Sequence, residues 1–181
     1  MHTDCCTRTC RPIHILTLIG ACSLVMLAST SGCSSVSRAE LQAARDTGVP
    51  VMFTDINIGS PNSAGGQTFE FRMINTSKKA LKYVEVTVVG YNQVADPVPC
   101  RVRRSMERPC QLTGPFQPGS PGDAFNIFSF RNLWYDARVV CAQFVGARIT
   151  YMDGTSVSYD RRDIHQLLSE KLEKPCGVRG Y

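Results

Sequence analysis

The feature that most constrains the fold is an alternation of apolar and polar side chains with a period of two residues. Apolar side chains stand at every second position of residues 69–73 with charged ones between them, and a similar alternation runs through residues 83–91. Successive side chains of a strand point to opposite faces, so the pattern predicts strands with one buried face. The side chains that we expect in the core are Phe69, Phe71, Val84, Val86, Val88, Ile149 and Tyr151.

Turn signals separate these strands and predict how they connect. Asp153-Gly154 lies between two β-prone segments, residues 147–152 and 155–159, and this dipeptide is a strong hairpin signal. Residues 139–152 are apolar on both faces near their start, which predicts a central strand with a bulge at Gly146. About seven to eight short strands at this spacing predict a mainly β fold, an antiparallel sandwich over residues 49–160.

Two helices are expected to flank the sandwich. Ser37 and Glu40 have the spacing of a capping box, which predicts a short helix from Ser37 to Arg45, within a tether rather than the core. The second is an amphipathic helix in residues 161–181 that Asp163 can cap. Its apolar face is formed by Ile164, Leu167, Leu168 and Leu172.

The first 32 residues have the organisation of a secretory signal peptide. Arg8 and Arg11 precede an apolar run over residues 13–28, and small residues follow it up to Cys33. A basic start, a short apolar region and a small-residue cleavage site are the three parts of such a signal. The run is too short and too polar for a membrane-spanning helix, so we expect an exported protein.

Small residues followed by Cys33 resemble the lipobox of bacterial lipoproteins, although Thr30 stands where lipoboxes usually carry leucine. The resemblance implies that Cys33 is lipidated and begins the mature chain, with residues 33–48 as a tether to the membrane. The residue after Cys33 is Ser34 and not an aspartate. By analogy with Gram-negative lipoproteins, this implies the outer membrane, facing the periplasm. A plain secreted or membrane-anchored protein is the alternative.

Cysteine usage also favours export. Of nine cysteines, four lie in the predicted signal peptide and one is Cys33. The remaining candidates for disulfides are Cys100, Cys110, Cys141 and Cys176. An oxidising compartment favours two disulfides, and we prefer Cys100–Cys110 with Cys141–Cys176 over Cys100–Cys141 with Cys110–Cys176. Buried free thiols are the alternative, and the absence of a C-x-x-C pair gives no support to a metal site.

The mature chain has few residues that suit catalysis. Removing 32 of the 181 residues leaves 149, with one histidine, His165, and lowers the formal net charge from +5 to +4. We expect His165 on the surface, and the charge is too small to indicate nucleic-acid binding. The chain has no G-x-S-x-G nucleophile motif and no phosphate-binding or other cofactor motif. Carboxylates distant in sequence could still meet, so a small envelope hydrolase is the alternative to a non-enzymatic binding or assembly module.

Two segments are candidate binding sites. Arg101, Arg103, Arg104 and Arg108 lie between Cys100 and Cys110, opposed only by Glu107. This segment could engage an acidic envelope protein or an anionic envelope component, although a solvated charged loop is the simpler interpretation. The second candidate is the pair Trp134 and Tyr135, which could be an exposed anchor or a core plug between two sheets.

Several short motifs occur together in one order along residues 51–159. They are Asn75-Thr76-Ser77, Leu81-Lys82-Tyr83-Val84, Tyr91-Asn92, Asp96-Pro97-Val98, Thr113-Gly114-Pro115, Leu133-Trp134-Tyr135 and Tyr151-Met152-Asp153-Gly154. In this order they resemble a group of bacterial exported proteins of unassigned activity with a single immunoglobulin-like domain. The resemblance implies an immunoglobulin-like sandwich and no catalytic residue.

Overall fold

The structure is a computed structural model that describes residues 36–119, 126–172 and 176. The predicted signal peptide and Cys33 lie outside these residues, so export and lipidation stay predictions. Within the described residues, no helix is both long enough and apolar enough to cross a membrane.

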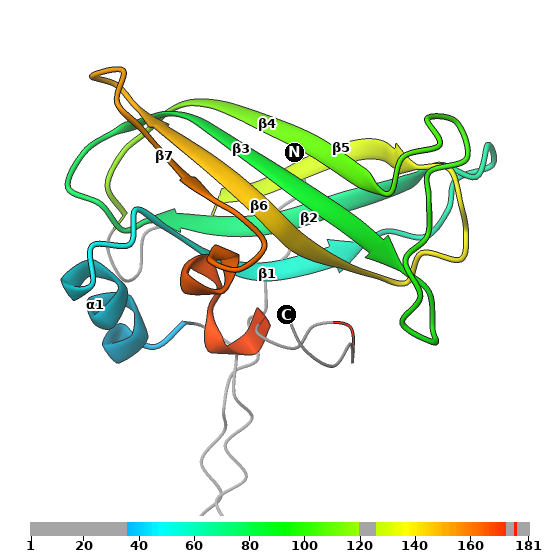
Figure 1. Cartoon of the computed structure of the whole chain (residues 1–181), viewed down its shortest axis with the longest axis horizontal. Coiled ribbons are helices and arrows are strands. Elements are labelled where there is room, and N and C mark those ends of the chain that lie inside the picture. The colour runs from blue at the N-terminus through cyan, green and yellow to red at the C-terminus, as the bar shows by residue number, and fades with distance from the viewer. Residues whose placement is uncertain (1–35, 120–125, 173–175, 177–181) are drawn as a thin grey trace, which may run out of the picture. The chain divides into compact units, whose positions relative to one another are not determined.

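The described residues form seven strands in two antiparallel sheets (Figure 1). The strands are β1 (Val51–Ile58), β2 (Gln67–Asn75), β3 (Leu81–Tyr91), β4 (Glu107–Phe116), β5 (Asn126–Trp134), β6 (Cys141–Tyr151) and β7 (Ser156–Tyr159). One sheet has the order β1-β2-β5 and the other β4-β3-β6-β7. The mainly β expectation and the predicted number of strands are therefore confirmed.

Strand alternation places the predicted core between the two sheets. Phe69 and Phe71 of β2 are buried, as are Val84, Val86 and Val88 of β3. Six of the seven predicted core side chains are buried, and Tyr151 is the exception because it is only half-buried at the end of β6. There its ring lies 5.5 Å from the Lys79 ammonium group, close to solvent.

Aromatic side chains from both sheets fill the centre of the core. Phe53 of β1 stacks on Phe144 of β6, with 4.4 Å between ring centroids. Phe69 of β2 makes an edge contact with the fully buried Trp134 of β5 at 5.7 Å. Aromatic pairs of this kind add to the free energy gained from burial alone, and the Phe53–Phe144 pair joins the two sheets.

The predicted hairpin and bulge both form. Gly154 has a positive φ of 85° in the turn between β6 and β7, and the Asp153 carboxylate accepts hydrogen bonds from the backbone and hydroxyl of Thr155. The register between β3 and β6 shifts at the step from Thr87 to Val88, opposite Gly146. Both features were predictable because a few neighbouring residues decide them.

The predicted N-terminal helix is α1 (Arg38–Asp46), and Ser37 caps it by accepting a hydrogen bond from the Glu40 N–H at 3.0 Å. The expectation that it belongs to a tether is wrong. Leu41 is buried, and the Glu40 carboxylate accepts a hydrogen bond from the Glu170 N–H at 2.9 Å. The helix therefore packs onto the domain, because its apolar side must be covered.

The predicted C-terminal α-helix is not formed in the described residues. Two short 3₁₀-helices, η1 (Ile164–Leu167) and η2 (Glu170–Leu172), replace it, with Leu168 extended between them. Leu168 forms a parallel bridge with Phe53 of β1, and the Ser169 N–H donates to the Phe53 carbonyl at 2.9 Å. Pairing with the open edge of β1 therefore interrupts the helix, while its predicted apolar residues are still buried.

Candidate functional site

The four arginines between Cys100 and Cys110 do not share one loop. Arg108 lies in β4, its side chain is buried, and its Nε donates to the Leu133 carbonyl at 3.0 Å. The three others lie in the connection between β3 and β4 and are exposed. The expectation that Arg108 belongs to an exposed charged loop is therefore wrong, because its guanidinium is buried and bonded to the protein's own backbone.

A buried carboxylate organises the surface beside this connection. The Asp136 side chain is fully buried, yet it pairs with Arg101 and Arg138, whose side chains are 70% and 62% exposed. Its pKa is held below the usual aspartate range, first by the hydrogen bond from Arg138 and then by further hydrogen bonds and the charge of Arg101. Asp136 therefore stays ionised and holds the guanidinium groups of Arg101 and Arg138 in place at the surface.

Arg103 and Arg104 lie in the same connection as Arg101. We call the group of Arg101, Arg103, Arg104 and Arg138 the arginine end. Arg103 and Arg104 are exposed and have no ion pair among the described residues. Exposed valines lie in the two connections that carry these arginines. Val94 at 74% exposure and Val102 at 69% lie between β3 and β4, and Val140 lies between β5 and β6. Val94, Val140 and Arg138 line one shallow pocket of about 270 Å³, so apolar side chains lie beside a charged one on this surface.

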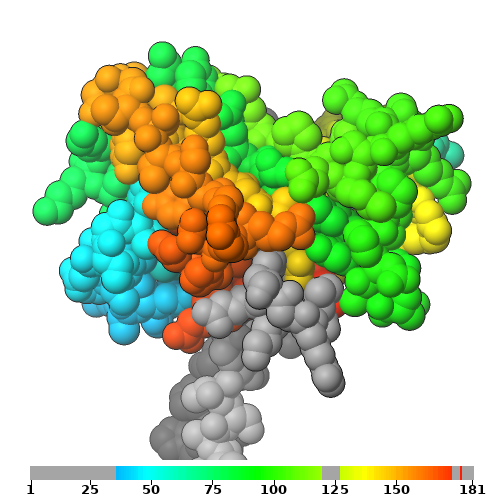
Figure 2. All heavy atoms as spheres, viewed as in Figure 1, coloured from blue at the N-terminus to red at the C-terminus, as the bar shows by residue number. Residues whose placement is uncertain are grey.

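The arginine end and α1 lie at opposite ends of the sandwich. Figure 2 shows the green β3–β4 connection on one side of the visible face and the cyan α1 on the other. The strand β3 runs between the two ends with 11 residues, which corresponds to roughly 35 Å at the rise of an extended strand. A ligand at one end would therefore not touch the other.

Trp134 and Tyr135 pack in and against the core of the domain and do not form an exposed anchor. Trp134 is fully buried between the sheets, and Gly90 packs against its indole ring. Tyr135 is half-buried and packs against the same core. Of the two interpretations of Trp134, the core plug is therefore confirmed and the exposed anchor is wrong, because a side chain between two sheets cannot contact a partner.

One of the two predicted disulfides is present. Cys141, at the start of β6, is bonded to Cys176, and their Cα atoms lie 5.6 Å apart. Cys100 and Cys110 are buried free thiols, so the predicted Cys100–Cys110 bridge is not formed. Cys100 begins a turn that its backbone closes with Arg104 and Ser105, whereas Cys110 lies inside β4, opposite Val86. The two cysteines therefore do not flank a simple hairpin loop.

The two free thiols differ in acidity. Burial opposes ionisation of Cys100, but hydrogen bonds from backbone N–H groups, above all that of Arg103, and the charge of Arg108 outweigh it and lower its pKa. Burial raises the pKa of Cys110 to about 12, despite the opposing charge of Arg108. Cys100 is therefore the more acidic of the two core thiols.

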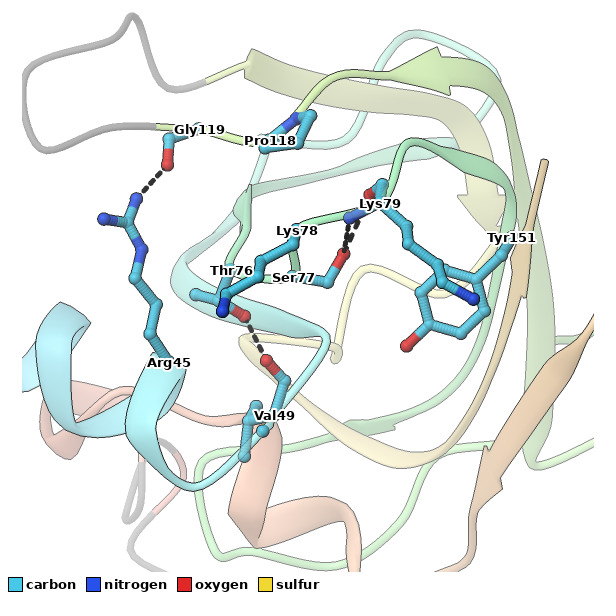
Figure 3. A pocket seen from close by; sticks show the side chains of 10 residues that line it. Arg45, Val49, Thr76, Ser77, Lys78, Lys79, Pro118, Gly119 and Tyr151 are labelled. Atoms are coloured by element: carbon cyan, nitrogen blue, oxygen red, sulfur yellow. Dashed lines mark hydrogen bonds between the residues drawn. The ribbon is translucent and has the colours of Figure 1, made fainter. Parts of the chain in front are cut away.

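A groove lies at the α1 end of the domain and has a volume of about 760 Å³. Its walls come from the end of α1, the link to β1, the β2–β3 turn, the segment after β4, and Tyr151 of β6. Figure 3 shows Arg45 on one side, Tyr151 on the other, and Lys78 over the turn between them. The Arg45 guanidinium donates to the Gly119 carbonyl, which fixes its position at the rim.

No metal-binding group of histidine, cysteine and acidic side chains occurs in the part of the chain that the structure describes. His165 is exposed as predicted, with Nδ1 2.6 Å from the Arg162 carbonyl oxygen.

The Asp153 carboxylate pairs with the Lys79 ammonium group at 2.6 Å, and that hydrogen bond is the first cause of the lowered pKa of Asp153. Asp136 and Asp153 are thus both engaged by cations.

Sequence reasoning did not identify Asp136, Arg138 or the groove. An acid and an arginine two positions apart, directly after Trp134-Tyr135, are the only local signal for the first pair. Lys78 and Lys79 are adjacent in a polar turn, but nothing in the sequence places Arg45 across from them. Comparisons with protein-family models, with curated proteins and with solved structures found no match for this chain.

Proposed function

We propose that this chain is an exported, non-enzymatic lipoprotein of the bacterial cell envelope that acts as a binding or assembly module. In this proposal Cys33 carries the lipid anchor, at the outer membrane facing the periplasm if the source is Gram-negative. The Cys141–Cys176 disulfide supports export, because disulfides persist in oxidising compartments. The order of the strands in the two sheets supports an immunoglobulin-like sandwich.

The observation that supports a binding role most strongly is the ion-pair arrangement at the arginine end. A fully buried Asp136 orients Arg101 and Arg138, and Arg103 and Arg104 extend beside them without partners among the described residues. Guanidinium groups pair with carboxylates and phosphates through two parallel hydrogen bonds. This surface therefore suits an acidic envelope protein or another anionic envelope component.

The carboxylates favour this proposal over a hydrolase. A general acid at neutral pH needs a pKa raised toward 7, whereas the pKa values of Asp136 and Asp153 are both lowered by their cationic partners. Both carboxylates therefore remain ionised and paired, which suits positioning of charge rather than proton transfer.

Lipidation is tested by metabolic labelling with a fatty-acid analogue. The wild-type protein should incorporate the label, and the Cys33→Ala variant should not. Equal labelling of both proteins would remove the lipoprotein part of the proposal.

Binding is tested by photo-crosslinking in cells. Ala137 is exposed at the arginine end, so a photo-crosslinking residue there should capture an envelope component. The double variant Arg103→Ser/Arg104→Ser should lose most of this capture, and added salt should weaken it in wild type. The matched control Lys82→Ser/Arg148→Ser removes two exposed charges from the four-stranded sheet and should leave capture intact. Capture that survives the first double variant would contradict a role for the arginines.

A further inference from the structure

We propose that the groove beside α1 binds an amphiphile with an acidic head group, a carboxylate or a phosphate ester, and an apolar chain. This site lies at the opposite end of β3 from the arginine end, so the inference does not depend on the function proposed above. It rests on the charges at the rim, the saturation of the wall's own polar groups, and the apolar surfaces inside.

The rim carries an excess of positive charge. Arg45, Lys78 and Lys79 line the groove, and among the residues that the structure describes, Lys79 alone of the three has an acidic partner, Asp153. Lys78 is exposed and makes no ion pair among the described residues. Arg45 uses one N–H group on the neutral Gly119 carbonyl and has no ion pair among the described residues. An acidic group between Arg45 and Lys78 would receive charge-assisted hydrogen bonds from both.

The polar groups of the wall are already engaged within the protein. The Thr76 hydroxyl donates to the Val49 carbonyl, and the backbone N–H groups of Thr76 and Ser77 donate to the Pro50 carbonyl. The Ser77 hydroxyl is bonded to Asn75 and Lys79. A neutral polar ligand would therefore find few free partners, whereas an anion would find the two side-chain cations at the rim.

Apolar surface lies between and beyond these cations. Val49, Pro118 and the ring of Tyr151 belong to the lining, and Figure 3 places Arg45 and Tyr151 on opposite sides of the groove. A volume of about 760 Å³ is within the range of pockets that hold small organic ligands. The acidic head would lie at the Arg45 and Lys78 side, and the chain would extend over Val49 toward Tyr151.

The test uses the full chain in nanodiscs of phosphatidylcholine, with soluble eight-carbon probes. Octyl phosphate and octanoate are the acidic probes, octyltrimethylammonium is the cationic control with the same chain, and inorganic phosphate is the head group alone. Chemical-shift changes of the backbone amides from Thr76 to Lys79 report binding in the groove. We expect either acidic probe to bind at least tenfold more tightly than the cationic probe and than inorganic phosphate. Octyl phosphate as the tighter of the two would indicate a phosphate-headed lipid, and octanoate a fatty acid.

Two variants separate binding from folding. Lys78→Ser removes a side chain without an ion-pair partner among the described residues, so it should not affect folding, and we expect about tenfold weaker binding of the acidic probes. Arg45→Gln should weaken binding similarly while keeping an N–H donor for Gly119. The matched controls Lys82→Ser and Arg103→Gln remove equal charge elsewhere and should change nothing. Equal binding of cationic and acidic probes, phosphate binding as tight as octyl phosphate, or no effect of Lys78→Ser would overturn the proposal.

Discussion

Arg138 closes on the buried carboxylate of Asp136 with two side-chain hydrogen bonds, Nε to Oδ1 at 2.9 Å and Nη2 to Oδ2 at 2.7 Å. The Arg138 backbone N–H also donates to Oδ1 at 3.1 Å. The carboxylate is removed from water, while the guanidinium stays at the surface. The three-residue segment from Asp136 to Arg138 thus fixes the direction of one arginine, and the Asp136 Oδ2 atom also accepts a hydrogen bond from Arg101.

We expect Asp136→Asn to destabilise the domain by about 1–3 kcal/mol, because a buried acceptor of several hydrogen bonds loses its charge and places an amide beside two guanidinium groups. Urea unfolding of wild type and variant measures this difference. Asp153→Asn is the control, since it removes the acid of the exposed Asp153–Lys79 pair and should have a much smaller effect. An Asp136→Asn variant as stable as wild type would contradict the structural role of this carboxylate.

The stability of the domain should depend on pH through Asp136. Its pKa in the folded state lies below the value of about 3.9 for an unfolded chain. The ionised carboxylate therefore contributes its full stabilisation above about pH 5, and this contribution is lost as the pH falls through the folded pKa. Unfolding free energies measured from pH 6 downward should fall more steeply for wild type than for Asp136→Asn. Parallel curves would show that the carboxylate is not stabilised by its arginines.

The mature protein should contain one disulfide and two thiols. Mass spectrometry after alkylation in denaturant without reductant should find Cys141 and Cys176 joined, and Cys100 and Cys110 alkylated. The bond closes a loop across a sequence separation of 35 residues, so Cys141→Ser/Cys176→Ser should cost about 2–4 kcal/mol of stability. Two disulfides in the native protein would show instead that Cys100 and Cys110 also join.

Cys100 and Cys110 should differ in reactivity under native conditions. Backbone N–H groups lower the pKa of Cys100, whereas burial raises that of Cys110 to about 12, so a larger fraction of Cys100 is thiolate. Both thiols are buried, so both should react slowly with iodoacetamide, Cys100 before Cys110. Time-resolved alkylation followed by peptide mass spectrometry measures the order, and Cys110 reacting first would contradict the assignment.

Gly90 lies too close to Trp134 to carry a side chain. A Cβ at this position would lie 3.0 Å from atoms of the indole ring and 2.8 Å from Cγ1 of Val139. We expect Gly90→Ala to cost about 1–3 kcal/mol through overpacking of the core. Gly146→Ala is the matched control, because its new Cβ would approach nothing closer than 3.4 Å. Thermal unfolding of both variants should show a clearly lower midpoint for Gly90→Ala alone.

Local signals in the sequence were sufficient for the strands, the first helix and the last hairpin. The Ser37 cap, the Asp153-Gly154 turn and the alternation around Phe69 each depend on residues only a few positions apart. Backbone geometry and side-chain periodicity act over that same distance, so the pattern predicts the element. Local signals were not sufficient to place Trp134, because an aromatic side chain can fill a core or contact a partner. Only the packing of the two sheets decides between these two positions.

The sequence by itself determined the strands, the first helix, the apolar faces and the cysteines available for bonding. Only the tertiary structure decided which distant groups meet. Asp136 comes to lie beside Arg101 because the connections before β4 and before β6 are at the same end of the sandwich. Leu168 leaves its helical pattern because the edge of β1 offers a backbone partner. Such contacts join groups far apart along the chain, and their free energy becomes available only once both sheets have formed, so no local pattern encodes them.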